Sequence, residues 1–200
     1  MGDAMDNCEY DSGNYGMRMH IVIAADEIAK TREYDDTRIM DICMAANISR
    51  QTFYNYFRDK LDMLFWERSA LMNDFFYRQS SLCGWNEALA LALKIDSHAN
   101  NLLQRITASK DNARFMELCE DLYCSIFRKE LKARGIVETD QYSFYIHYGA
   151  VVLCRCLDDW YRSGRAMDVD TLIKWLDDMT PPLMRSMREL PVRWEMKQPF

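Results

Sequence analysis

The sequence contains few residues that break helices or form tight turns. Its 200 residues include only seven glycines and four prolines, so many closely spaced turns are not expected. Segments rich in Val, Ile and Thr between turn residues, which would indicate β-strands, are also scarce. The hydrophobic share of 49% and the charged share of 28% are those of an ordinary globular protein. These features predict an all-α fold.

No segment is typical of export or of a membrane span. The first residues include Asp3, Asp6, Glu9 and Asp11, whereas a signal peptide begins with positive charge and an apolar stretch. The longest apolar run, 149–154, is much shorter than the roughly 20 residues that a membrane helix needs. We therefore expect a cytoplasmic protein with no membrane partner.

The seven cysteines form no recognisable metal or disulfide pattern. Cys154 and Cys156 form a C-x-C pair, and no histidine is spaced as a metal ligand beside a cysteine. Glycine-rich phosphate loops and catalytic serine motifs are absent as well. The sequence thus predicts no metal, no cofactor, no catalytic residue and no enzyme. Reduced, buried thiols are the favoured interpretation, and a thiol-reactive sensor at Cys154 and Cys156 is the alternative.

The charge of the chain does not by itself indicate a nucleic-acid partner. The net charge is −6, whereas nucleic-acid-binding domains are often strongly basic. Residues 1–16 contain four acids and no Lys or Arg, and residues 17–66 contain seven bases and eight acids. Nucleic-acid binding must therefore be inferred from the arrangement of side chains.

Apolar residues recur at helical spacing after an acidic start. Residues 1–16 are polar and aperiodic, which predicts a disordered arm. A helix is predicted over about 17–32, and two short helices follow it. Thr37 is expected to cap the first of these helices and Ser49 the second, which ends near residue 57. Asn47 tolerates positive φ and can close the turn between them.

The remaining sequence also predicts helices. Asp59 is expected to cap a longer helix that runs to about residue 81. The further helices are expected over 85–106 (one or two helices), 111–134, 140–163 and 169–180, with Gly135, Gly164 and Pro181 as terminators.

The two short helices and the preceding one have the pattern of a helix-turn-helix unit. Such a unit needs an apolar interface between its helices, for which Ile39, Ile42, Cys43 and Ala46 have the right spacing. It also needs a polar outer face on the last helix, which enters the major groove. Side chains that can bond to base edges and phosphates form this face: Ser49, Arg50, Gln51, Thr52, Tyr54 and Asn55.

At these residues the sequence resembles the tetracycline-repressor (TetR) family. The string Ser49-Arg50-Gln51-Thr52-Phe53-Tyr54-Asn55-Tyr56-Phe57-Arg58-Asp59-Lys60 is similar to the family's S-x-x-T-F-Y-x-Y-F-x-D-K. Asn47 replaces the family's usual turn glycine, and Glu33 stands where a glycine commonly follows the first helix. Farther on, Gly149, Trp160 and Gly164 resemble the aromatic-G-W-G pattern of a subgroup that includes an activator of dihydroxyacetone metabolism.

The resemblance implies a role for each matching residue. Thr37, Arg38 and Lys60 would contact phosphates, while Arg50 and Gln51 would face bases, with Arg50 the best candidate for a bidentate guanine contact. The remaining members would bond phosphates, pack over the sugar backbone or reach bases: Ser49, Thr52, Tyr54, Asn55 and Tyr56.

The resemblance also implies a homodimer formed by the helices over 140–163 and 169–180. The first of these is apolar nearly all round, since Phe144, Tyr148 and Val151 extend its stripe, so it needs burial on two sides. A helix fully buried in a monomer is the alternative. The expected dimer interface consists of Tyr145, Gly149, Val152, Cys156, Trp160, Leu172 and Leu176.

Regulators of this family usually bind a small effector in the C-terminal domain. Aromatic and methionine side chains would suit an apolar pocket or a dry core equally well: Trp85, Phe115, Met116, Tyr123, Phe127, Tyr145 and Tyr148. We thus expect an arm (1–16), a helix-turn-helix domain (17–66) and a helical regulatory and dimerisation domain (67–200).

The expected function is that of a homodimeric, ligand-responsive transcriptional regulator on a near-palindromic double-stranded DNA operator, more often a repressor than an activator. The alternative is a partner-binding module of the same fold with little affinity for DNA. The absence of net positive charge in residues 17–66 motivates that alternative.

Overall fold

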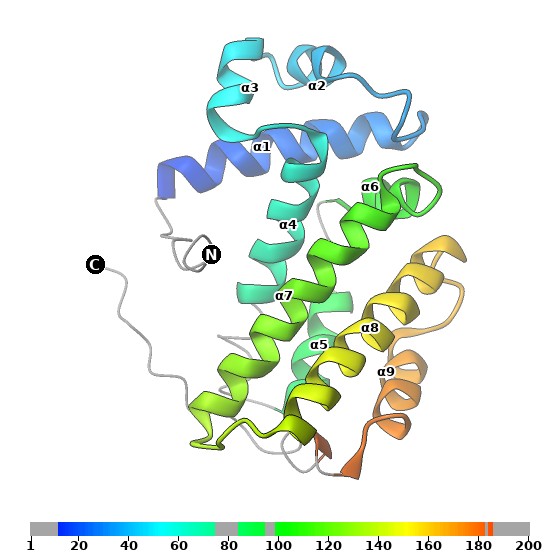
Figure 1. The fold of residues 1–200 in the computed structure, drawn as a ribbon. Helices are drawn as coiled ribbons and strands as arrows, with labels where there is room; N and C mark the ends of the chain where they lie inside the picture. Colours follow the sequence, from blue (N-terminus) through cyan, green and yellow to red (C-terminus); the bar gives the residue numbers. More distant parts are fainter. Residues whose placement is uncertain (1–11, 75–83, 95–98, 183, 186–200) are drawn as a thin grey trace.

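The computed structural model describes residues 12–74, 84–94, 99–182 and 184–185. Within these ranges all the regular elements are helices, which confirms the all-α fold (Figure 1). The helices are α1 (Ser12–Ala29), α2 (Ile39–Ala45), α3 (Arg50–Tyr56), α4 (Lys60–Asp74), α5 (Trp85–Lys94), α6 (Asn100–Ile106), α7 (Asn112–Ala133), α8 (Asp140–Arg162) and α9 (Val169–Asp178).

The first helix begins earlier than the sequence pattern indicates. Residues 12–16, which the sequence assigns to a disordered arm, belong to α1. The ring of Tyr15 lies 5.4 Å from that of Trp66 on α4, and the Arg18 guanidinium lies 5.5 Å from the same ring. These contacts with α4 stabilise the first turns of α1. They come from a distant part of the chain, so the spacing of apolar residues within the helix does not predict them. Residues 1–11 of the expected arm lie outside the described residues.

Helices α1, α2 and α3 form the head of the molecule, at the top of Figure 1. Its core contains Ile42 and Cys43 of the expected interface, together with Ala25 and Phe53, and each of these side chains is at most 1% exposed. Ile39 is half-buried beside them. The apolar residues of α2 therefore form its interface with α1 and α3, as their spacing predicts.

The body consists of α5–α9 and most of α4, which descends from the head along α7 (Figure 1). The chain reverses between α7 and α8 at Gly135, whose φ is +68°, a value that side chains with a Cβ rarely adopt. The segment predicted as one or two helices over 85–106 forms two, α5 and α6. The predicted extension of α4 from Asp74 to about residue 81 lies outside the described residues.

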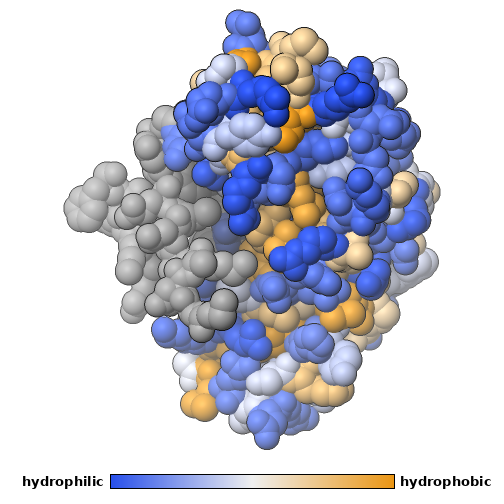
Figure 2. Space-filling model, turned by 45° about the horizontal axis from the view of Figure 1, so that its top comes forward, coloured by the Kyte–Doolittle hydropathy of each residue, from blue (hydrophilic) through white to orange (hydrophobic). Residues whose placement is uncertain are grey.

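The surface seen in Figure 2 is largely hydrophilic, with one hydrophobic band along its middle. The described helices include none that is long and apolar enough to span a membrane.

Candidate nucleic-acid interface

The turn between α2 and α3 has the geometry that the sequence predicts. Asn47 has φ of +52°, and the Ile48 N–H donates to the Cys43 carbonyl at 2.9 Å. Ser49 caps α3, since its Oγ accepts a hydrogen bond from the Thr52 N–H at 3.0 Å. The His20 Nε2 atom lies 2.8 Å from the Ala46 carbonyl oxygen, a link between α1 and this turn that sequence reasoning missed.

The outer face of α3 carries an ordered set of polar side chains. Phe53 points into the head, while Arg50, Gln51 and Asn55 are exposed. The Arg50 Nη2 atom donates to the Tyr54 hydroxyl at 3.5 Å, and Gln51 Nε2 donates to Asn55 Oδ1 at 3.1 Å. These pairs are one helical turn apart, so they form two rows along the helix. The face thus exposes a charged donor and two amides, side chains of kinds that can bond to base edges.

The two other members of the predicted set on α3 are less accessible. Thr52 and Tyr56 are half-buried. The Thr52 hydroxyl lies 2.8 Å from the Ser49 hydroxyl, and Tyr56 packs against the core of the head. Only the exposed part of the Thr52 or Tyr56 side chain could therefore contact another molecule.

Thr37 does not have the position that the sequence analysis assigned to it. It is 2% exposed, and its hydroxyl donates to the Glu33 carbonyl at 2.9 Å. The N-cap of α2 is instead Arg38, whose backbone N–H donates to Asp41 Oδ2 at 3.0 Å. Because the Thr37 hydroxyl donates its one hydrogen to this carbonyl, it cannot donate to a phosphate without breaking that bond. The Arg38 side chain is exposed.

Lys60 also differs from its predicted role as a free phosphate ligand. Its Nζ donates to the carbonyls of Tyr34 and Thr37, each at 2.6 Å, and lies 4.3 Å from the Tyr34 ring centre. Burial lowers the pKa of Lys60 below its usual value. Two of the three N–H bonds of the ammonium therefore hold the segment between α1 and α2. Tyr34, which sequence reasoning missed, is 1% exposed and is the single apolar side chain in the acidic run 33–36.

Arg58 is a further cation, two residues beyond the C-terminal end of α3. Its side chain is 87% exposed and pairs with Asp62 at 3.0 Å. Exposed pairs of this kind contribute little to stability, so Arg58 can exchange its carboxylate for a phosphate. The sequence analysis assigned no role to this residue.

The head and the body are joined by carboxylates of the head. Asp26 of α1, 8% exposed, accepts hydrogen bonds from the N–H groups of Asn101 and Leu102 in α6, at 2.9 and 3.0 Å. Glu33 forms an ion pair with Arg105, and Asp35 accepts a hydrogen bond from the Ser109 hydroxyl at 2.6 Å. Asp26 is thus covered by α6, a helix that lies about 75 residues farther along the chain.

The expected dimer residues fall into two groups. Trp160, Leu172 and Leu176 are only 6–7% exposed. Helix α9 packs against α5 within the same chain, and the Trp160 indole N–H donates to the Met167 carbonyl at 2.7 Å. A Cβ added at Gly149 would meet Phe127 of α7, which also faces the body. Trp160, Leu172 and Leu176 were expected at the surface of contact and lie inside the subunit, while Gly149 is half-buried. Of the predicted set, Val152 is exposed, and Tyr145 and Cys156 are half-buried.

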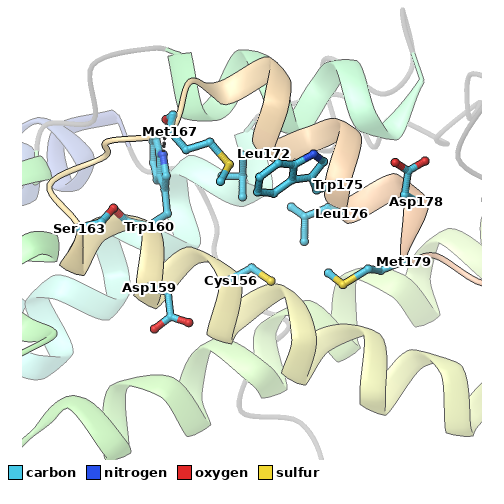
Figure 3. A pocket seen from close by; sticks show the side chains of 10 residues that line it. All are labelled: Cys156, Asp159, Trp160, Ser163, Met167, Leu172, Trp175, Leu176, Asp178 and Met179. Atoms are coloured by element: carbon cyan, nitrogen blue, oxygen red, sulfur yellow. Dashed lines mark hydrogen bonds between the residues drawn. The ribbon is translucent and has the colours of Figure 1, made fainter.

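A groove of about 530 Å³ separates α8 from α9 on the surface (Figure 3). Cys156, Trp175 and Met179 point into it. Phe144, Tyr148 and Val152 are 57%, 52% and 40% exposed and precede Cys156 on α8 at intervals of four residues, on one helical face. This apolar strip therefore leads along α8 into the groove.

The described cysteines of α7 and α8 are free thiols: Cys119, Cys124, Cys154 and Cys156. Cys119 and Cys154 are buried, and burial raises the pKa of Cys119 to about 12. Within the described residues, no cluster of His, Cys, Asp and Glu has the arrangement of a metal site. Cys156 is the more accessible member of the C-x-C pair.

The aromatic side chains proposed for a pocket are divided between core, cavity and surface. Trp85 and Phe127 lie in the core with ring centres 5.4 Å apart, and Tyr148 is exposed. Phe115 and Tyr123 line a small interior cavity of about 30 Å³, bounded by α4, α6, α7 and α8.

Comparison with known proteins agrees with this geometry. Residues 21–65 match the family model described as bacterial regulatory proteins, tetR family. The chain is 29% identical over 155 residues to an HTH-type dhaKLM operon transcriptional activator, DhaS, of Lactococcus lactis, with 74% of this chain and 81% of that protein covered.

Solved structures show the same fold. A dihydroxyacetone kinase operon activator DhaS has a TM-score of 0.57 at 23% identity, covering 86% of this chain and 98% of the other. FadR of Thermus thermophilus, a TetR-family repressor solved with lauroyl-CoA, has a TM-score of 0.52 at 20% identity, covering 92% and 99%. The resemblance to the TetR family and to the dihydroxyacetone subgroup is thus confirmed, and the similar proteins are regulators rather than enzymes.

Proposed function

We propose that this chain, whose residues 21–65 form the N-terminal domain of the tetR family of bacterial regulatory proteins, is a ligand-responsive transcriptional regulator that binds a near-palindromic operator as a homodimer. The observation that carries the proposal is the outer face of α3, where Arg50, Gln51 and Asn55 are exposed together. Helices of this kind place such side chains against base edges in the major groove.

The phosphate contacts in this proposal come from the edges of α3. Arg38 at the start of α2 and Arg58 after α3 are both exposed, and cations there can bracket the backbone on either side of the groove. Arg50 would read a guanine, and Gln51 or Asn55 an adenine. Lys60 would act indirectly, by holding the segment that precedes Arg38.

A second copy of the chain is the proposed occupant of the strip and groove on α8 and α9. The strip exposes Phe144, Tyr148 and Val152, and Trp175 and Met179 of α9 are 54% and 56% exposed at the groove. Large apolar side chains gathered in this way mark a surface of association. A twofold pairing of α8 and α9 would bury them in a four-helix bundle and set two α3 helices in successive major grooves.

The proposed response to ligand passes through α6. Leu103 and Ile106 of α6 line the interior cavity, and the N-terminus of the same helix is capped by Asp26 of α1. A ligand that enlarges the cavity would shift α6 and with it the head, which changes the separation of the two α3 helices. The lauroyl-CoA complex of the Thermus FadR is consistent with effector binding in a protein of this fold.

Repression is the proposed mode of regulation. A dimer bound over a promoter blocks polymerase by occupancy alone, with no additional contact surface. The Thermus FadR is a repressor, whereas the Lactococcus relative is an activator. A reporter under the flanking promoter distinguishes the two modes, because deletion of the gene raises expression only under repression.

The proposed function is tested by binding to DNA from the region flanking the gene. The purified chain is titrated against an inverted repeat from that region and against a scrambled duplex, at several salt concentrations. We expect preferential binding to the repeat, with an affinity that falls steeply as salt rises because phosphate contacts release counterions. Binding to neither duplex at low salt would favour the second candidate, a partner-binding module, which the net charge of residues 17–66 motivates.

A further inference from the structure

Arg68 places a positive charge in the interior of the body. It lies on α4 and is 3% exposed. Its Nη2 atom donates to the Tyr161 hydroxyl on α8 at 3.1 Å, and its guanidinium carbon lies 5.5 Å from the centre of that ring. An arginine side chain stays charged at any ordinary pH. The body therefore contains a permanent buried cation.

The second terminal nitrogen of this guanidinium has no hydrogen-bond partner in the part of the chain that the structure describes. The Nη1 atom is buried and unpaired. Glu67, next to Arg68 on α4, attracts the guanidinium electrostatically but gives Nη1 no hydrogen bond. A buried charge with an open donor is costly, so native proteins usually provide a partner for it.

Asp158 on α8, which lines the same cavity as Arg68, does not provide that partner. Both oxygens of Asp158 are already engaged: Oδ1 accepts from Asn112 Nδ2 at 3.2 Å, and Oδ2 accepts from Arg162 Nη2 at 2.9 Å. The open position beside Arg68 is thus suited to an anion from outside the chain.

Arg68 lines the interior cavity of about 30 Å³. That space exceeds the ~10–15 Å³ that one water molecule needs, so a ligand larger than a small polar group must expand the cavity. The walls are mainly apolar, with Leu103, Ile106, Phe115, Met116 and Leu157 among them. One charged donor in an apolar cavity is the usual composition of a small-molecule site, in which the donor fixes the orientation of the ligand.

We propose that Arg68 binds the oxyanion of an effector, a carboxylate or a phosphate group attached to a hydrocarbon chain, through Nη1. Tyr161 holds the guanidinium in position, and the planar fork of the arginine matches the oxygen atoms of either group. The hydrocarbon part enlarges the cavity against α6. The inference rests on the proposed function in calling this ligand an effector.

The test measures binding to the full chain by calorimetry in the absence of DNA and at constant ionic strength. The probes are hexanoate, hexyl phosphate and the neutral hexanamide. We expect at least one anion to bind about tenfold or more tightly than the amide, because a hydrogen bond to a charged group is the difference between them. Tighter binding of hexanoate would indicate an effector with a carboxylate, and tighter binding of hexyl phosphate an effector with a phosphate group.

Arg68→Met should abolish the preference for the anion, and Arg114→Met, which removes a 65% exposed arginine on α7, should preserve it. The methionine variant is expected to fold, since an apolar side chain of similar length replaces an unpaired buried charge. If the variant fails to fold, comparing the three probes on the unsubstituted chain still tests whether the site prefers an anion. Equal binding of anion and amide, binding of none of them, or a preference that survives in Arg68→Met would each overturn the proposal. Because the measurement contains no DNA, such a result leaves operator binding untouched, and a failure to bind the operator leaves this result untouched.

Discussion

Asp26 of α1 and Asn101 of α6 are joined by two hydrogen bonds, from the Asn101 N–H to Oδ1 at 2.9 Å and from Asn101 Nδ2 to Oδ2 at 2.6 Å. The N-cap of α6 is Ala99, which makes no side-chain capping bond. A carboxylate from 75 residues earlier thus satisfies the open N–H groups of that helix. The contact makes α6 a part of both the body and the head.

Replacement of Asp26 by alanine should destabilise the chain. The change leaves the N–H groups of Asn101 and Leu102 without their acceptor in a mostly buried site, so we expect a loss of about 1–3 kcal/mol in the free energy of unfolding. Urea denaturation measures it. Glu27→Ala, one position along and paired with Lys30 in solvent, serves as the control and should change stability by less than about 0.5 kcal/mol. Equal losses in the two variants would contradict the capping role.

Lys60→Met distinguishes an internal contact from a phosphate contact. Since Nζ donates to two carbonyls within the head, we expect a lower melting temperature and weaker binding to every DNA sequence, with the salt dependence of binding unchanged. A lysine that contacts a phosphate would instead reduce the salt slope by about one upon replacement. The slope of affinity against salt concentration, compared with that of Arg58→Met, decides between the two.

Arg50→Ala should relax sequence preference rather than destabilise the head. Its side chain is exposed and interacts with Tyr54 alone on its helix, so the melting temperature should hardly change. Loss of a bidentate base contact should weaken operator binding by about 1–3 kcal/mol and leave binding to scrambled DNA nearly intact. Titration of both duplexes measures the difference. A parallel loss on the two would assign Arg50 to the backbone instead.

Val152→Glu should separate the proposed dimer into folded monomers. The side chain is 40% exposed on the apolar strip of α8, so a carboxylate is tolerated in the monomer but would be buried without a partner in a symmetric interface. Sedimentation gives the oligomeric state, and circular dichroism the helical content. Val137→Glu, at a 79% exposed site off the strip, is the matched control and should remain dimeric.

Thiol labelling should distinguish Cys156 from the other cysteines of the body. Burial raises the pKa of Cys119 to about 12 and raises that of Cys154 as well, so little thiolate forms at neutral pH. We expect iodoacetamide to modify half-buried Cys156 before Cys119, Cys124 and Cys154 in Val152→Glu monomers, and more slowly in the dimer, where the groove is covered. Mass spectrometry of digests identifies the site. Rapid labelling of Cys154 would restore the thiol-sensor alternative.

Local patterns in the sequence were sufficient for the recognition unit. Asn47 and Ser49 determine their own geometry, since positive φ and N-capping depend on the residue and its immediate neighbours. The alternation of Phe53 with exposed polar residues fixes which face of α3 is free. The sequence also showed that the helix over 140–163 carries more apolar surface than one side can bury.

The structure departs from the sequence-based expectations at residues whose partners are distant in the chain. Nothing near Lys60 indicates that its ammonium would reach the carbonyl of Tyr34, 26 residues earlier. Thr37 has a side chain of a type that often caps helices, yet its hydroxyl donates to the Glu33 carbonyl after α1. On α8 and α9 a periodicity argument identifies an apolar stripe but not which part of it the neighbouring helices cover, so Trp160 and Leu172 were placed at the contact surface.

The sequence by itself determined the all-α class, the turn between α2 and α3, the polar outer face of α3, and the resemblance to the TetR family. These depend on short-range backbone preferences and on side chains within one or two helical turns. The tertiary structure alone decided that Asp26 caps α6, that Lys60 is internal, and that Arg68 lies buried beside a cavity with an open donor. Each of these follows from packing between helices, which brings together groups that are far apart in the chain.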